Sequence, residues 1–321
     1  ILMAAVQLAT LDAPLRPILI GNQKRVAERA SAVGVEAAPL YVIDPETSPE
    51  TPRLADAYAA RREGTKPGLA LRAVRKPLFF AGMMLACGDA QAMVGGATCP
   101  TARVIEAAML TVGLAEGVSA PSSFFIMQRE AGPLVFADCA VNVAPDVETL
   151  AAIGVASASS CRALLGIEPR VAFLSFSTHG SASHEHARKV RAAVLRAREL
   201  CPGVAFDGEL QADAALDPRV AAMKVKEQGE VAGRANVLVF PDLSAANIGY
   251  KLVQYLGGAK ALGPFLQGFA VIFPSNQARQ AREELTDVHA RAVVIGDTFQ
   301  KDRQRQTKAA EKEPHQRPSF R

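Results

Sequence analysis

Length, composition and charge exclude several classes of protein. The 321 residues are 49% hydrophobic and 21% charged, so the chain can bury a large core, and no run approaches the roughly 20 apolar residues of a membrane span. The net charge of +4 equals the excess of seven basic over three acidic residues in the stretch 300–321, so the remainder is neutral and offers no nucleic-acid surface. The residues at the given N-terminus lack the basic start of a signal peptide, and we expect a cytoplasmic protein that contacts neither membranes nor nucleic acids. Because it begins at Ile1 and not at methionine, we also expect that an upstream piece is missing.

Short apolar runs alternate with helical patterns over the first third of the chain. Strands are predicted where apolar residues cluster before a breaker, and helices where apolar residues recur every three to four positions. The predicted strands are residues 17–20, 40–43 and 92–95, and the predicted helices are residues 23–33, 54–62, 69–75, 79–86 and 101–112. This alternation predicts a mostly parallel, doubly wound α/β sheet.

A departure from that alternation indicates a second α/β region. Residues 122–128 and 134–143 are apolar runs separated by the charged turn Arg129-Glu130-Ala131-Gly132, a pattern typical of a β-hairpin. Beyond it we predict a long helix over 147–165, followed by strands at 171–176, 204–206, 237–240 and 261–266. Residues 300–321 are rich in Gln, Lys, Arg and Glu and have almost nothing apolar, which predicts a disordered basic tail.

The chain is organised around a strand, a polar loop and a helix start between Val171 and Lys189. Residues 171–176 form the buried strand, residues 177–181 (STHGS) supply hydroxyls and a glycine, and Ser183 is a suitable N-cap for the helix that follows. Backbone N–H groups converge at such a helix start, and the helix dipole adds about half a positive charge. An ordinary capped helix has the same pattern, and an anion site is the functional interpretation.

Two more polar loops follow predicted strands, so that three loops share one edge of the predicted sheet. They are residues 177–181, 207–213 (DGELQAD) and 241–247 (PDLSAAN). Ligands of open α/β sheets bind at the carboxyl ends of strands, and the hydroxyls, amides and glycines of these loops suit a phosphorylated ligand. Neither GxGxxG nor GxxxxGK[ST] occurs. Five scattered cysteines without a CxxC pair predict no metal site and no disulfide framework.

These segments resemble the phosphate acetyl/butyryltransferase family, in particular its phosphate acetyltransferase branch. The similar segments are LSFSTHGSA, FDGELQADAAL, VAGRANVLVFPDLSAANIGYKLVQ and GPFLQG, preceded by RPILIGN, VIDPETSP, VGGATCPTARVIEA and PSSFFIM. The resemblance extends over about residues 15–270, and its longest run is Val231 to Gln254. It implies transfer of an acetyl group between acetyl phosphate and coenzyme A, where coenzyme A is a substrate and no cofactor is tightly bound.

The resemblance also implies a fold and an assembly. Members of the family are similar to the isocitrate and isopropylmalate dehydrogenases, with two α/β domains, a cleft between them and usually a homodimer. The implied first domain is discontinuous, residues 1–117 and 263–299, and the second domain, residues 118–262, is inserted into it. We therefore expect a homodimer whose active site combines loops of the second domain with Arg61 of the first.

Two arginines are implied as catalytic residues, because a planar guanidinium binds phosphate through two parallel hydrogen bonds. Arg61, in YAARREG, matches the arginine that the family places near the phosphate. The second family arginine falls at Glu106 of this chain, and Arg103 lies about one helical turn earlier, where it can project from the same face and pair with Glu106. The alternative for both arginines is a solvated residue on a helix surface.

Seven further residues are implied as substrate contacts, all in or beside the loops at the strand ends. They are Ser177, Thr178, Gly180, Ser181, Asp242, Asn247 and Gln267. Their hydroxyl, amide and backbone groups suit the holding of phosphate and coenzyme A, in a reaction that depends on positioning and charge stabilisation without a covalent intermediate.

After Gly268 the chain departs abruptly from the family, as a frameshift or a gene-end rearrangement would produce. Members continue with a Ser-Arg-Gly segment that orients the acyl phosphate and an aspartate proposed as the base for the thiol, whereas this chain has GFAVIFPSNQARQAREELTDVHARAVVIG. Gln277 and Ala278 fall at the serine and arginine positions. Residues with the right chemistry occur at the wrong spacing: Ser275, Arg279 and Asp287. We therefore expect weak substrate binding and slow acetyl transfer.

A second class of function stays open at this point. The alternative is a non-catalytic domain that binds acyl-CoA or assembles subunits, like the similar domain appended to malic enzymes. The segment PTARVIEA favours the free-standing enzymes, whereas the missing Ser-Arg-Gly segment favours the non-catalytic alternative.

Overall fold

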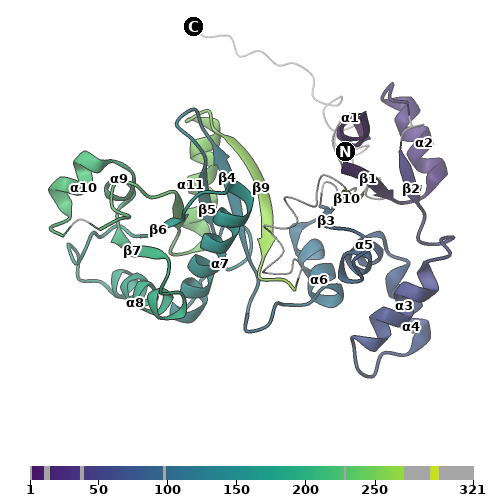
Figure 1. Ribbon diagram of the computed structural model, residues 1–321, viewed down its shortest axis with the longest axis horizontal. Helices are drawn as coiled ribbons and strands as arrows, with labels where there is room; N and C mark the ends of the chain where they lie inside the picture. The colour runs from purple at the N-terminus through teal and green to yellow at the C-terminus, as the bar shows by residue number, and fades with distance from the viewer. Residues whose placement is uncertain are drawn as a thin grey trace, which may run out of the picture. The chain divides into compact units, whose positions relative to one another are not determined.

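The computed structural model describes residues 2–10, 15–36, 40–96, 99–227, 229–270 and 290–295, and its internal contacts divide the chain into two units (Figure 1). The first unit comprises residues 1–112 and 272–321, and the second comprises residues 113–271. Each unit has its own β-sheet with helices packed on it, so the chain is a mixed α/β protein. Among the described residues, no helix combines the length and the apolar character needed to cross a membrane.

The first unit contains a four-stranded parallel sheet in the order β2–β1–β10–β3. Its strands are β1 (Leu15–Ile20), β2 (Tyr41–Ile43), β3 (Ala92–Val94) and β10 (Ala290–Ile295). The sequence predicts the first three of these strands. It does not predict β10, which lies beyond the motifs recognised in the sequence and pairs with β1 along its whole length.

The described residues of this unit form six helices, and all but the first are predicted by the sequence. They are α1 (Leu2–Thr10), α2 (Gln23–Ala32), α3 (Thr51–Ala60), α4 (Pro67–Val74), α5 (Pro77–Ala86) and α6 (Thr101–Thr111). The apolar α5 provides much of the core, and Phe80 and Met83 are fully buried. α5 needs a glycine where it meets α6, because a Cβ at Gly82 would lie 2.1 Å from Oγ1 of Thr111.

The second unit contains a six-stranded mixed sheet in the order β7–β6–β8–β5–β4–β9. Its strands are β4 (Ser122–Gln128), β5 (Leu134–Ala137), β6 (Arg170–Leu174), β7 (Ala205–Leu210), β8 (Val237–Val239) and β9 (Lys260–Gln267). β5, β6, β7 and β8 run parallel, and β4 is antiparallel to both of its neighbours. The β4–β5 pair confirms the predicted hairpin. β5 ends at Ala137 and not at residue 143, because the N–H groups that follow bond to the carboxylate of Asp138.

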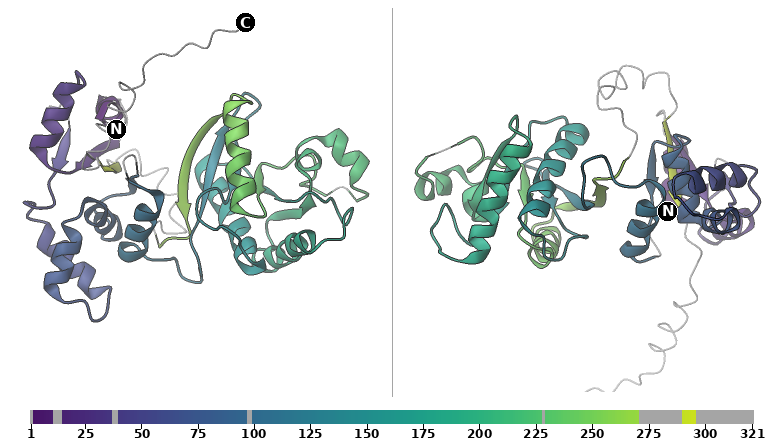
Figure 2. Two further views of the ribbon diagram at one scale, coloured as in Figure 1. Left: turned by 180° about the vertical axis from the view of Figure 1, so that it is seen from behind. Right: turned by 90° about the horizontal axis from the view of Figure 1, so that it is seen from below.

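Helices cover both faces of the second sheet, as the further views in Figure 2 show. The helices α7 (Val147–Leu165) and α8 (Glu185–Leu200) pack on one face, and α9 (Ala212–Leu216), α10 (Pro218–Lys224) and α11 (Leu243–Tyr255) pack on the other. Each face of the sheet has its own hydrophobic core, and neighbouring strand residues alternate between the two. Val135 packs in the core under α7 and α8, and Phe136 packs in the core under α9, α10 and α11. The predicted helix over 147–165 is confirmed. α8 is capped by His184 and not by Ser183, because His184 has the extended backbone of a cap.

The second unit extends beyond the point at which the sequence places the return to the first domain. That return is expected at residue 263, but β9 pairs with β4 as far as Gln267. This pairing keeps the chain in the second unit up to residue 271. The tail predicted over 300–321 lies outside the described residues.

Candidate functional site

The three predicted polar loops lie at the carboxyl edge of the six-stranded sheet, but two of them are partly regular structure. Residues 207–210 belong to β7, because the pairing with β6 continues to Leu210 and does not stop at residue 206, and residues 243–247 form the first turns of α11. Because β5, β6, β7 and β8 are parallel, the segments that follow them leave the sheet on the same side. Ser122 begins the antiparallel β4 and pairs with Gln267, the last residue of β9, so these two residues lie at this edge as well. The predicted contact residues of the second unit are thus brought to one edge.

The loop 177–181 precedes a helix start, but its backbone N–H groups are not available to a ligand. The N–H groups of residues 177–182 each donate to an acceptor within the protein. Two of the acceptors belong to Glu209: the N–H of Gly180 bonds to Oε1 at 2.8 Å, and the N–H of His179 bonds to the backbone carbonyl oxygen at 3.0 Å. The anion that the sequence predicts at this loop is therefore a side chain of the protein itself.

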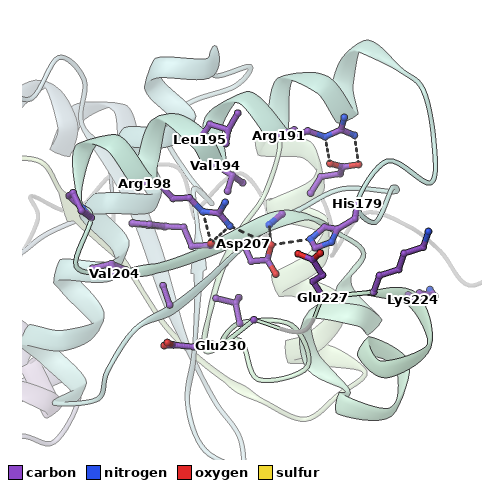
Figure 3. Close-up of a pocket in the computed structure, with 18 residues that line it drawn as sticks. His179, Arg191, Val194, Leu195, Arg198, Val204, Asp207, Lys224, Glu227 and Glu230 are labelled. Atoms are coloured by element: carbon purple, nitrogen blue, oxygen red, sulfur yellow. Dashed lines mark hydrogen bonds and ion pairs between the residues drawn. The ribbon is translucent and has the colours of Figure 1, made fainter.

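The carboxylate of Glu209 is fully buried and receives donors from the loop and from α8. Oε1 accepts the hydroxyl of Ser177 at 2.8 Å in addition to the N–H of Gly180. Arg191 on α8 donates from Nε to Oε2 at 2.9 Å and from Nη2 to Oε1 at 3.0 Å (Figure 3). Burial alone raises the pKa of this carboxyl group, but the hydrogen bonds from Arg191, Gly180 and Ser177 outweigh it and lower the pKa from 4.5 to about 2. Glu209 is therefore ionised at neutral pH.

Strand β7 and the residue that follows it hold the loop at two more points. Oγ1 of Thr178 accepts the backbone N–H of Gln211 at 3.0 Å and donates to its side-chain oxygen at 3.2 Å. Nε2 of His179 lies 3.0 Å from Oδ1 of Asp207. Figure 3 shows the two side chains facing each other. Every second residue from 207 to 211 therefore holds part of the loop, which explains the alternation of polar residues in DGELQ.

Gly208 allows β7 to approach its neighbours at the position before Glu209. A Cβ at Gly208 would lie 2.7 Å from the backbone oxygen of Phe173 in β6 and 3.1 Å from Cγ2 of Val194 in α8. Gly208 also has a φ of +145°, which residues with a side chain rarely adopt. A glycine is therefore required for Glu209 to reach the loop.

A second buried carboxylate, that of Asp138, lies in the loop after β5 and is 3% exposed. It accepts six hydrogen bonds, all from uncharged donors. The donors are the N–H and hydroxyl of Ser123, the N–H groups of Ala140, Val141 and Asn142, and the side-chain amide of Asn142. Asp138 thereby fixes the path of the loop and ties it to the start of β4.

The loop after β8 leads into α11, which carries two predicted contact residues. Asp242 caps this helix, because its Oδ1 accepts the N–H of Ala245 at 2.8 Å. Asn247, one turn further along, is partly buried and donates from Nδ2 to the backbone oxygen of Cys139 at 3.4 Å. The side chain of Asn247 thus links α11 to the loop that Asp138 organises.

Lys189 on α8 joins two of the loops at this edge. Its Nζ donates to the backbone oxygen of Pro145 at 3.1 Å and to that of Pro241 at 3.0 Å. These prolines directly precede Asp146 and Asp242, which cap α7 and α11. The ammonium group therefore lies beside the starts of two helices.

Gln267 is 7% exposed, and its amide is engaged on both sides. Nε2 donates to the hydroxyls of Ser122 and Ser157, at 2.9 Å each, and Oε1 accepts the hydroxyl of Ser160 at 2.8 Å. The side chain joins the ends of β4 and β9 to α7. A substrate that contacted this amide would have to replace one of these bonds.

A groove of about 1120 Å³ runs along the outer side of the edge strand β7 (Figure 3). Arg198 lies in it and donates from Nε and Nη2 to the backbone oxygen of Phe206 at 3.1 and 2.7 Å. Lys224, at its other side, donates to Oδ2 of Asp213 at 2.7 Å. The groove is lined by charged side chains of both signs, and the cations of Arg191, Arg198 and Lys224 bond within the protein, so it does not select an anion or a cation.

The two predicted catalytic arginines belong to the first unit. Arg61 follows α3 and donates from Nη2 to the backbone oxygen of Ala86, at the end of α5, at 2.7 Å. Arg103 on α6 has a side chain that is 70% exposed, and its Nη1 lies 3.8 Å from Oε2 of Glu106. The pairing of Arg103 with Glu106 is therefore present as a loose surface ion pair, which contributes little stability.

Sequence reasoning did not identify the roles of Glu209, Arg191 and Lys189. For Glu209 a signal exists, because an acidic side chain that shares a short strand with the apolar Phe206 and Leu210 requires a partner when it is buried. For Arg191 no local signal exists, since α8 carries several basic residues and only its packing on β7 selects one of them. The positions discussed for the divergent segment lie outside the described residues: Ser275, Gln277, Ala278, Arg279 and Asp287.

Comparisons with known proteins agree with the resemblance seen in the sequence. A family model described as phosphate acetyl/butaryl transferase matches residues 1–295. The phosphate acetyltransferase of Thermoanaerobacterium thermosaccharolyticum is 44% identical over 285 residues, which cover 86% of each chain. That of Clostridium acetobutylicum is 42% identical over 285 residues, which cover 86% of this chain and 85% of the relative. A crystal structure of a phosphotransacetylase from Streptococcus pyogenes has a TM-score of 0.77 at 35% identity and covers 90% of this chain and 89% of that chain. The chain therefore belongs to the phosphate acetyl/butyryl transferase family.

Proposed function

We propose that this chain is a phosphate acetyltransferase, which transfers an acetyl group between acetyl phosphate and coenzyme A. The observation that carries the proposal is the family match over residues 1–295, which includes the three loops at the carboxyl edge and the arginines of the first unit. The relatives at 42–44% identity that are named phosphate acetyltransferase favour an acetyl substrate. In this proposal coenzyme A is a substrate, no cofactor is tightly bound, and the protein is cytoplasmic.

The reaction requires two anionic substrates to be held together. The thiolate of coenzyme A forms a carbon–sulfur bond to the acetyl carbonyl carbon while the carbon–oxygen bond to phosphate breaks, and the phosphate leaves with the electron pair. Positioned cations stabilise the leaving phosphate. We assign this role to Arg61 and Arg103. A guanidinium has five N–H donors, and the bond from Arg61 to Ala86 uses one of them while it orients the group.

The predicted contacts of the second unit take two roles in this proposal. Direct contact with substrate is assigned to three residues that keep an exposed part: Ser181, Asp242 and Asn247. Shaping of the edge is assigned to four residues whose polar groups bond within the protein: Ser177, Thr178, Gly180 and Gln267. We further propose a two-domain architecture of the isocitrate dehydrogenase type, with a discontinuous first domain, in which Arg61 and the edge loops serve one reaction.

A homodimer is also part of the proposal, and an apolar face of α11 supports it. Ile248, Leu252, Tyr255 and Leu256 follow each other at helical spacing and are 58%, 52%, 81% and 82% exposed. Leu262 on the edge strand β9 is 49% exposed, and β9 packs beside α11. An apolar face of this kind is typical of a protein interface. Sedimentation of a Tyr255→Asp, Leu256→Asp variant tests the dimer: we expect monomers for the variant and dimers for the parent chain.

Formation of acetyl-CoA from acetyl phosphate and coenzyme A by the purified protein tests the activity. We expect slow turnover, because this chain lacks the Ser-Arg-Gly segment and the aspartate at the spacing that the family uses. A positioned base contributes about 10²–10⁴-fold to the rate, and a fixed charge stabiliser about 10²–10³-fold. A version that carries the Ser-Arg-Gly segment of the family after Ala270 should be faster. Equal rates for the two proteins would show that this segment is dispensable.

Arg61 can be tested against its neighbour. Arg61→Met should abolish the remaining transfer, whereas Arg62→Met should leave it unchanged, because Arg62 lies over the ring of Tyr58 at 5.9 Å and has no assigned role. Absence of transfer by both the parent and the repaired protein, together with no calorimetric binding of coenzyme A at millimolar concentration, would overturn the proposed function.

A further inference from the structure

The loop 177–181 and the helix α8 together present a complete set of donors for an oxyanion. The set consists of the backbone N–H of Gly180, the hydroxyl of Ser177 and the guanidinium of Arg191. Donors of these three kinds commonly bind phosphate and carboxylate ligands. The sequence predicts a substrate anion at this place, but the structure has Glu209 there.

We propose that Glu209, held by Arg191, is a built-in anion that fills the loop 177–181, fixes its conformation and keeps substrate phosphate out of it. The two oxygens of Glu209 occupy the positions of two oxygens of a bound anion, with donors at 2.8 to 3.0 Å. Glu209 is thus a positioning residue that acts through the loop.

Burial separates Glu209 from an ordinary surface ion pair. The side chain of Glu209 is 0% exposed, whereas that of Arg191 is 45% exposed. The anion is therefore enclosed between β7 and the loop, while its cation closes the site from the surface. The remaining N–H groups of residues 177–182 are also engaged, which leaves the loop without a vacant backbone donor for a second anion.

A consequence for substrate binding follows, and this part rests on the proposed function. The phosphate groups of acetyl phosphate and coenzyme A bind elsewhere on the carboxyl edge and at the arginines of the first unit. The loop then contributes shape and exposed side chains such as Ser181. The occupation of the loop by Glu209 holds whether or not the chain transfers acetyl groups.

Chemical rescue tests the occupation of the loop directly. Glu209→Ala removes the carboxylate and leaves its donors, so formate or acetate in solution should enter the vacated space and raise the midpoint of thermal unfolding as its concentration increases. The matched control is Glu148→Ala. Glu148 on α7 is 65% exposed and lies 2.8 Å from Arg196, which is on α8 like Arg191. Neither the control variant nor the parent protein should respond to formate.

Hydrogen exchange measured by mass spectrometry gives a second readout that does not depend on the alanine variant folding well. Glu209→Gln keeps the size of the side chain but presents an N–H₂ group to donors, so the amides of residues 177–182 should exchange about tenfold faster or more, while the amides of α7 should not change. Arg191→Met should have the same local effect, because it leaves the carboxylate without its cation.

Inorganic phosphate distinguishes the proposal from a loop that binds substrate. Phosphate should slow the exchange of the loop amides in Glu209→Ala and should not do so in the parent protein. Protection of these amides by phosphate in the parent would overturn the proposal, as would unchanged loop exchange in Glu209→Gln together with no rescue of Glu209→Ala. Calorimetric titration of the parent with coenzyme A reports separately on the proposed function.

Discussion

The loops after β5 and after β6 each enclose a buried carboxylate, and they stabilise it in different ways. Glu209 is held by one guanidinium and by two donors from a loop that is distant in sequence. Asp138 is held by six uncharged donors, of which four come from the four residues that follow it. Both solutions satisfy the requirement that a buried charge be paired or fully hydrogen-bonded. They differ in what the carboxylate holds in place, since Asp138 shapes its own loop and Glu209 shapes another one.

The difference also predicts which carboxylate can be lost more easily. The donors around Asp138 are mostly backbone groups and cannot move away without unfolding the loop. Arg191, by contrast, has a side chain that is 45% exposed and can turn into solvent when its partner is removed. The carboxylate of Glu209 should therefore be lost more easily than that of Asp138.

The largest effect is expected at Asp138. Asp138→Asn places an N–H₂ group against the N–H and side-chain amide of Asn142, so donors face donors in a buried space, and we expect a loss of about 3–5 kcal/mol in the free energy of unfolding. Urea denaturation measures this loss. As a control, Asp146→Asn changes a carboxylate that caps α7 through one bond, to the N–H of Thr149, and should cost about 1 kcal/mol or less. Equal losses in the two variants would contradict the contrast.

Acidification should remove the contribution of Glu209. The pKa of this carboxyl group is 4.5 when unperturbed and about 2 in the folded protein. Because the folded-state pKa is lower, the stabilisation is complete above pH 4.5 and is lost as the pH falls toward 2, by about 3 kcal/mol in total. The measurement is the pH dependence of the unfolding free energy for the parent and for Glu209→Gln. A constant difference between the two proteins down to pH 2 would show that Glu209 does not titrate in this way.

An intermediate effect is expected at Gly208, which permits the approach of β7 to β6. Gly208→Ala introduces a Cβ 2.7 Å from the backbone oxygen of Phe173, and we expect a loss of about 2 kcal/mol with faster exchange of the loop amides. Gly203→Ala is the control, because a Cβ there meets nothing within 4 Å. If the loop amides of Gly208→Ala exchanged at the parental rate, the order of the loop would not depend on the position of β7.

The smallest effect is expected from Arg191→Lys. The variant keeps the positive charge but cannot form two parallel hydrogen bonds to Glu209, so we expect a loss of about 1 kcal/mol. Arg196→Lys, on the same helix and paired with the exposed Glu148, should cost less than half of that. A larger loss for Arg196→Lys would mean that burial of the acid does not determine the strength of these pairs.

Much of the fold follows from local patterns in the sequence. The apolar runs of β1, β4 and β6 and the long helix α7 were predictable because a regular element that packs against a core repeats its apolar residues with the period of that element. β10 was not predicted, because the family motifs recognised in the sequence end near residue 270, although the family model extends to residue 295. Its pairing with β1 also joins segments about 275 residues apart, which no local pattern indicates. The path after Ala137 was missed because an apolar run continues to residue 143, while Asp138 collects the N–H groups that a strand would have used.

By itself, the sequence determined the family of this protein, the α/β class, and the loops that meet at the carboxyl edge. The motifs STHGS and DGELQ already indicated a polar site there. Only the tertiary structure decided that the two motifs bind each other, so that the donors of the first are occupied by Glu209 of the second. The physical reason is that residue types specify which hydrogen bonds are possible, whereas the partner of a buried charge depends on which helix and strand pack against it.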